Sequence, residues 1–130
     1  MPHPFFSKRP LVFAHRGGSA LAPENTLAAF DNGLALGADG LELDVHVSRD
    51  GVVVVHHDRL LARTTNLHGA IAEHTADDLS RADAGYHFAP AGGFPFRGRG
   101  VGVPALLDVL NRYRDVPIIV EVKVNSAQMA

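Results

Sequence analysis

Between residues 41 and 47 the chain alternates apolar and polar positions, and after a turn it continues as a run of valines. A period of two predicts a β-strand that has one apolar face and one face of polar and ionisable groups. Asp50 and Gly51 tolerate the positive φ angles of a tight turn, so the valines at 52–55 predict the second strand of a β-hairpin. This second strand is apolar throughout and suits burial on both sides. Carboxylates beside it therefore require a partner such as a cation.

The polar face of the hairpin carries carboxylates and imidazoles, and their arrangement depends on the length of the turn. A two-residue turn places Asp44 opposite His57, with Cβ atoms about 5 Å apart. A three-residue turn with a bulge places Asp44 opposite His56 instead, and His57 then points away. Either register gathers two carboxylates, those of Glu42 and Asp44, and one imidazole. The alternative interpretation is a polar strand face that only meets water.

The rest of the chain alternates between strand and helix patterns, which predicts an α/β domain. Leu27 and Phe30 lie on the apolar stripe of the first predicted helix, so we expect them in the core. Residues 84–102 are rich in Gly, Pro and aromatic residues and predict a surface or lid loop. They lack the Lys-Ser/Thr ending of a phosphate-binding P-loop. The elements expected outside the hairpin are strands at 11–14 and 118–124, helices at 23–36 and 104–114, and a capped helical turn at 75–79.

Charged side chains stand at the ends of two of these predicted strands. His15 and Arg16 precede two glycines, which let a ligand approach the backbone closely, and arginine suits bidentate contact with phosphate. Glu121 and Lys123 lie two positions apart on the last strand and so share a face. The alternatives are an ordinary turn with an exposed histidine and arginine, and an edge-strand ion pair that faces water.

Composition narrows the class of protein. The 130 residues suffice for one domain with a core, and a formal net charge of −2 argues against a nucleic-acid binder with a strong basic field. The absence of cysteine excludes disulfides, thiolate zinc sites and a cysteine nucleophile. No apolar run approaches the about 20 residues of a membrane span. The N-terminus also lacks the apolar stretch of a signal peptide, so we expect a cytoplasmic protein.

Six motifs, taken together and in order, resemble those of the glycerophosphodiester phosphodiesterase family, and they cover residues 11–124. The motifs are His15-Arg16-Gly17, Pro23-Glu24-Asn25-Thr26, Glu42-Leu43-Asp44-Val45, Asp50-Gly51 with the run at 53–58, Pro104 with Leu106 and Val109-Leu110, and Glu121-Val122-Lys123. The resemblance implies a TIM (β/α)8-type barrel with its site at the C-terminal ends of the strands.

The resemblance also implies a role for each matching residue. The roles are ligands of a divalent cation, Mg²⁺ or Ca²⁺, for Glu42, Asp44 and Glu121, catalytic histidines for His15 and His57, and contacts with phosphate for Arg16 and Lys123. The family pattern gives His56 no role, and it therefore favours the two-residue turn of the hairpin. An antiparallel hairpin conflicts with the parallel strands of a barrel, and we expect the clustering of the side chains to hold.

By resemblance, the protein is a phosphoric diester hydrolase of lipid and glycerol metabolism. It would use paired-histidine acid/base catalysis and a cation to hydrolyse a glycerophosphodiester, a small-molecule substrate, to an alcohol and glycerol 3-phosphate. Two alternatives stay open. One is a non-catalytic half-barrel remnant that binds cation or phosphate, and the other is a related phosphodiesterase that acts on sphingomyelin or lysophospholipid.

The length of the chain departs from the family pattern. A (β/α)8 barrel needs about 250 residues, whereas this chain has 130 and would stop near the fourth strand. We therefore expect residues 1–130 to form a single, incomplete phosphodiesterase domain, roughly the first half of the barrel. It would be a fragment of a longer product or a truncated paralogue. Open strand edges would favour self-association, and we expect weak or no activity from the isolated chain.

Overall fold

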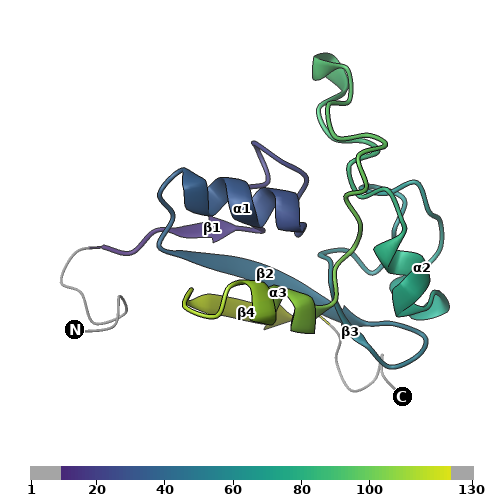
Figure 1. The fold of residues 1–130 in the computed structure, drawn as a ribbon. Helices are drawn as coiled ribbons and strands as arrows, with labels where there is room; N and C mark the ends of the chain where they lie inside the picture. Colours follow the sequence, from purple (N-terminus) through teal and green to yellow (C-terminus); the bar gives the residue numbers. More distant parts are fainter. Residues whose placement is uncertain (1–9, 124–130) are drawn as a thin grey trace.

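One strand organises the fold, because every other strand described pairs with it (Figure 1). The computed structural model describes residues 10–123, and β2 (Gly40–Val47) is the central strand of its sheet. β1 (Phe13–His15) and β4 (Ile118–Val122) pair with β2 in parallel, and β3 (Val53–Val55) pairs antiparallel with its last residues. The domain is therefore a parallel α/β unit that carries an antiparallel hairpin.

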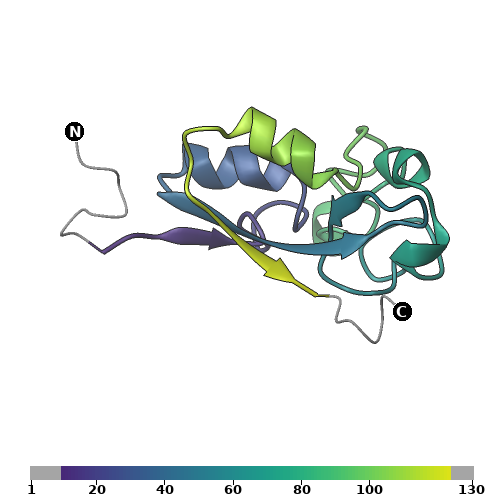
Figure 2. The same ribbon diagram turned by 90° about the horizontal axis from the view of Figure 1, so that it is seen from below.

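Two helices, α1 (Leu27–Ala35) and α3 (Leu106–Arg112), cover the same face of this sheet (Figure 2). Phe30 of α1 is fully buried, as the apolar stripe predicts, and it packs edge-on against Tyr113 with ring centroids 6.1 Å apart. These rings meet the apolar side chains of the sheet in the larger core cluster. Its buried members are Phe30, Leu41, Leu43, Val45, Val55, Val109 and Tyr113. Partly buried Leu27 packs against this cluster, in agreement with its predicted place in the core.

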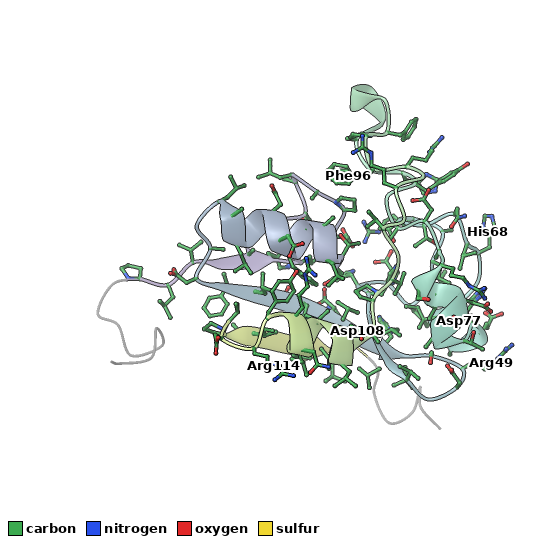
Figure 3. All side chains as sticks on the ribbon, in the orientation of Figure 1. Arg49, His68, Asp77, Phe96, Asp108 and Arg114 are labelled. Atoms are coloured by element: carbon green, nitrogen blue, oxygen red, sulfur yellow. The ribbon has the colours of Figure 1, made fainter. Side chains whose placement is uncertain are left out.

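A second cluster, with as many buried members but fewer partly buried residues packed against it, lies under the segment between β3 and α3. This segment contains the short helix α2 (Ala76–Ser80) and the 3₁₀ turns η2 (Ile71–Glu73) and η3 (Pro90–Gly92). Buried Val54, Leu61, Ile71, Leu79, Ala82, Ala84 and Val103 form the cluster. Residues 84–102, here called the arm, start from this cluster at Ala84 and project away from the sheet, and they carry Phe96 (Figures 1 and 3). The predicted surface loop at 84–102 is confirmed.

The predicted helices are present but shorter than expected. The first helix begins at Leu27 instead of residue 23, because Asn25 has a φ of +55° and the Thr26 hydroxyl caps the helix by accepting from the amide of Ala29. The predicted cap of α2 is confirmed, since Thr75 accepts from the amide of Asp78 at 3.1 Å. The last predicted strand covers residues 118–124, and its residue 124 lies outside the described residues.

The hairpin has the three-residue turn, so the register favoured by the family resemblance is wrong. Val45 pairs with Val55, and the amide of His56 donates to the Asp44 carbonyl. Ser48 sets this register: its amide donates to the Val52 carbonyl at 2.9 Å, and its hydroxyl accepts from the Val52 amide at 3.0 Å. The strand ends at Val55, so the direction of His57 is decided by the loop that follows rather than by the pleat.

The strand directions resolve the conflict between a hairpin and a barrel. Among residues 10–123, β1, β2 and β4 are parallel, and β3 is the one antiparallel addition. The fourth strand in chain order is thus the third parallel strand, so the described chain holds three parallel strands and not four. The apolar residues of β4 predict a buried strand, but in the structure most of them are exposed: the relative accessibility is 47% for Ile119 and 64% for Val122. Within the described residues β4 pairs only with β2.

Replacement of Phe30 by alanine tests the larger core cluster. Its ring is fully buried between α1, α3 and the sheet, so Phe30→Ala should lower the free energy of unfolding by about 3–5 kcal/mol. Leu36→Ala is the control, because Leu36 is exposed just past the end of α1. Urea denaturation measures both, and equal effects of the two substitutions would contradict this core assignment.

Candidate active site at the ends of the parallel strands

Three carboxylates meet on one face of the sheet. Glu42 and Asp44 alternate along β2 and share a face, and Glu121 of β4 is paired in register with Asp44. One oxygen of each residue lies within 4.8 Å of the others. Asp44 is buried, Glu42 is half-buried and Glu121 is exposed. The clustering predicted for these three side chains is therefore present in the fold.

Two cationic side chains border these carboxylates. The Lys123 ammonium lies 3.1 Å from a Glu121 oxygen and 3.8 Å from an Asp44 oxygen. The hydrogen bond with Glu121 raises the pKa of Lys123, and the same bond lowers the pKa of Glu121. Arg16 Nε lies 3.8 Å from Asp44, and the Arg16 amide donates to Glu42 at 3.2 Å. Positive charge thus reaches the cluster from both neighbours of β2.

The two candidate catalytic histidines lie beside different carboxylates. His15, at the end of β1, has Nε2 3.8 Å from Glu42, and its side chain is 66% exposed. His57 is close enough to Glu121 to contribute, after Lys123 and Asp44, to the lowering of the Glu121 pKa. The His57 carbonyl accepts a hydrogen bond of 2.8 Å from Nε2 of buried His46. The fold therefore joins six of the seven predicted site residues through contacts around the carboxylates, and His57, held by Asp58, acts on the cluster through its charge.

Asn25 is a buried part of the site, whereas its sequence pattern predicted only a helix start and a place in a family motif. Its side-chain amide donates to the buried Asp44 carboxylate at 3.0 Å, and its backbone amide donates to the Arg16 carbonyl at 2.8 Å. Asparagine tolerates the left-handed conformation found here, φ +55°, better than most residues do. Asn25 thus links the His-Arg turn to the carboxylate cluster.

A second charged group, also missed from the sequence, joins Glu24, Asp58 and Arg63. Burial alone would raise the pKa of Glu24, but hydrogen bonds and charge from Arg63 and Arg16 lower it. Hydrogen bonds from Arg63 hold the pKa of Asp58 far below its usual range. Because residues 59–65 carry no periodic pattern, the sequence offered no signal for the place of Arg63.

His56, which has no assigned role, is a structural residue. Its Nδ1 donates to the Asp58 carbonyl at 2.8 Å, so its Nε2 accepts from the Thr64 hydroxyl at 3.0 Å. Burial lowers the pKa of His56, which favours the neutral ring that this pattern requires. In the arm, Arg97 likewise contacts its own segment, since its guanidinium carbon lies 3.9 and 3.8 Å from the ring centroids of Tyr86 and Phe94.

Comparison with known proteins agrees with this geometry. A model of the Glycerophosphoryl diester phosphodiesterase family matches residues 15–130. The chain is 41% identical over 116 residues to a glycerophosphodiester phosphodiesterase of Caldanaerobacter subterraneus, which covers 89% of this chain and 45% of the relative. It is 43% identical over 99 residues to one from Bacillus altitudinis, covering 76% of this chain and 38% of that one.

Solved structures give the same result. The crystal structure of glycerophosphodiester phosphodiesterase from Agrobacterium tumefaciens matches with a TM-score of 0.79 and 38% identity, over 88% of this chain and 47% of that one. An Oleispira antarctica phosphodiesterase in complex with the product sn-glycerol-3-phosphate matches with a TM-score of 0.75 and 34% identity, over 91% and 46% of the two chains.

The fold and the site define an α/β chain that corresponds to roughly the first half of a (β/α)8-type barrel. The chain belongs to the glycerophosphoryl diester phosphodiesterase family, and it spans less than half the length of these two curated relatives. Among residues 10–123, no helix has both the length and the apolar character that a membrane crossing requires.

Substitutions at Asn25 test its link to Asp44. Asn25→Gly removes the amide from a buried carboxylate, so we expect the free energy of unfolding to fall by about 1.5–3 kcal/mol. Asn25→Ala adds the strain of a left-handed backbone and should cost about 1 kcal/mol more. Denaturant titrations measure both variants. An alanine variant as stable as the glycine variant would show that the backbone conformation does not matter here.

The lowered pKa of Asp58 predicts a pH dependence of stability. Native Asp58 holds its proton less readily than a free aspartate, whose pKa is about 3.9. Its stabilisation is therefore complete above that value and is lost as the pH falls towards the folded-state pKa. Asp58→Asn should lower the melting temperature at neutral pH and make its decline on acidification shallower. Melting curves between neutral and acidic pH measure this, and an unchanged decline would contradict it.

Proposed function

We propose that this chain provides the catalytic residues for hydrolysis of a glycerophosphodiester to an alcohol and glycerol 3-phosphate. The observation that carries the proposal is the meeting of three carboxylates from adjacent parallel strands with the His15 imidazole and two cationic side chains, while His57 is near enough for its charge to act on Glu121. The family match supports the same reaction, and the Oleispira antarctica relative is described with sn-glycerol-3-phosphate as its product.

The carboxylates of Glu42, Asp44 and Glu121 would hold a divalent cation, Mg²⁺ or Ca²⁺. Such hard cations prefer carboxylate oxygens, and each of the three residues offers one within 4.8 Å of the others. When bound, the cation would act as a Lewis acid on the phosphodiester. The donor set therefore fits the group that the family resemblance implies.

Arg16 and Lys123 would bind the phosphate and balance its charge in the transition state. Arg16 Nε is buried and has no hydrogen-bond partner among the described residues. A buried donor without a partner is costly, and a phosphate oxygen is a suitable acceptor for it. Lys123 approaches from the opposite neighbour of β2, so the two cations would contact the phosphate from different strands.

His15 and His57 would transfer the protons. One ring takes the proton of the attacking group, and the other gives a proton to the leaving alcohol oxygen. His57 contacts Asp58 through Nδ1, so Nε2 would be the nitrogen that exchanges a proton with the substrate. His15 is exposed at the end of β1, next to Arg16, where a bound substrate would cover it.

The exposed β4 favours a second candidate for the 130 residues alone, a unit that binds cation or phosphate with weak or no turnover. The Glu121 side chain of β4 is itself 55% exposed in the described structure, so water reaches the cluster at this carboxylate. Exclusion of water strengthens the electrostatic interactions on which phosphoryl transfer depends. Sphingomyelin or a lysophospholipid as the substrate, a cytoplasmic location and self-association through the open edge remain predictions.

A chimaera tests the proposed reaction. Residues 11–124 replace the matching segment of a full-length relative, and hydrolysis of glycerophosphocholine is measured with and without EDTA. We expect turnover that EDTA abolishes, and a loss of at least about 10²-fold in kcat for His57→Ala and for Glu42→Ala. Asp108→Ala, an exposed carboxylate on α3 (Figure 3), is the control that should keep full activity. Assays on lysophospholipid and sphingomyelin identify the substrate class.

Two results would contradict this proposal. If either variant keeps the rate of the parent chimaera, the role given to that residue is wrong. If titration calorimetry shows Mg²⁺ and Ca²⁺ binding equally to the 130-residue chain and to its Glu121→Gln variant, the carboxylates do not form the cation site. Robust hydrolysis by the purified 130-residue monomer would remove the second candidate.

A further inference from the structure

Arg63 lies between two carboxylates beside the candidate site and takes no part in the reaction proposed above. On one side its Nε and Nη2 donate to the two oxygens of Asp58 at 2.7 and 3.1 Å. On the other side its Nη2 and Nη1 donate to the two oxygens of Glu24 at 2.5 and 3.3 Å. A planar guanidinium can make both pairs of contacts at once, and an ammonium cannot.

Each of these carboxylates also contacts a side chain that takes part in the proposed reaction. Asp58 Oδ1 contacts His57 Nδ1 at 2.8 Å, and Glu24 Oε2 contacts Arg16 Nη1 at 3.4 Å. Arg63 is 39 residues from Glu24 in the sequence, so it joins the connection between β1 and α1 to the loop that follows β3. Without it, and among the described residues, the Glu24 carboxylate would keep only its contact with Arg16, and the Asp58 carboxylate only its contact with His57.

The contact with Asp58 decides which nitrogen of His57 carries the proton. Hydrogen bonds from Arg63 keep the pKa of Asp58 far below its usual range, so the carboxylate is ionised and can only accept. His57 Nδ1 must then be the donor, and the neutral ring has its lone pair on Nε2. If the Asp58 carboxylate swings away, this preference is lost.

The guanidinium group of Arg63 lies where a small cation from solution could take its place between Asp58 and Glu24. Its side chain is 51% exposed. It borders a cavity of about 230 Å³ whose wall also includes Ser19, Thr64 and His87. A free guanidinium ion is small enough to enter such a cavity when the arginine side chain is removed.

We propose that Arg63 is a positioning residue that, through Asp58 and Glu24, fixes the His57 ring in its Nδ1–H tautomer and fixes Arg16 relative to it. The importance of this geometry for catalysis rests on the proposed function of His57, whereas the tautomer itself does not. The two ideas can therefore fail separately.

Long-range ¹⁵N–¹H NMR spectra of the 130-residue chain read the tautomer without any hydrolysis assay. Spectra are recorded in alkaline buffer, where imidazole is neutral, and His57→Gln identifies the signals. We expect the Nδ1–H form of His57 in the wild type. Arg63→Ala should shift the ring to a mixture of tautomers, and added guanidinium chloride, compared with sodium chloride at equal ionic strength, should restore most of the Nδ1–H signal. Arg63→Lys keeps the charge and should restore less of it.

Arg112→Ala is the matched control. Arg112 of α3 is as exposed as Arg63, and it forms a bidentate pair with Asp31 of α1 at 2.6 and 3.1 Å. Its loss should lower the melting temperature and leave the His57 signals unchanged. In the chimaera, Arg63→Ala should lower kcat by about 10–100-fold, with recovery by guanidinium, and Arg112→Ala should not.

Three results would overturn the proposal. The first is a wild-type His57 with its proton on Nε2. The second is an Arg63→Ala variant that keeps the Nδ1–H form. The third is an Arg112→Ala variant that changes His57 as much as Arg63→Ala does, because the effect would then be a general loosening of the fold. If the tautomer of His57 responds to Arg63→Ala as expected and the chimaera is inactive, the result counts against the proposed function alone.

Discussion

The burial of the Asp44 carboxylate is the constraint on which the site depends. This side chain is almost fully buried, and a buried carboxylate must be matched by donors or cations nearby. The chain supplies them from three directions: Asn25 before α1, Arg16 after β1 and Lys123 after β4. The contacts that compensate the buried charge of Asp44 thus hold in place the ends of β1 and β4 and the segment that leads into α1.

Much of the site follows from local pattern. The period of two along β2 places Glu42 and Asp44 on one face, and the same period places Glu121 and Lys123 together on β4. That these two pairs meet requires parallel strands side by side, which the family resemblance implied and the strand and helix patterns alone did not. The family resemblance implied the role of each residue, and the structure supplied the distances between the side chains.

Other features could not be predicted, for identifiable physical reasons. The three-residue turn depends on hydrogen bonds of Ser48, and the motif did not encode them, so the favoured register was wrong. Asn25 and Arg63 act through contacts between distant segments, and neither stands in a periodic pattern. The exposure of β4 depends on what pairs with it, so a strand of buried character shows its apolar side chains to water.

The in-register pairing of Asp44 with Glu121 also protects the sheet against misalignment. A slip of β4 by one residue along β2 would reverse every side chain and bring Val120 or Val122 next to the buried carboxylate. The ammonium of Lys123 would leave that face at the same time, so the buried carboxylate of Asp44 would lose a cation and gain an apolar neighbour. The acidic and basic residues of the site therefore favour the native register of β4 along β2 over the slipped one.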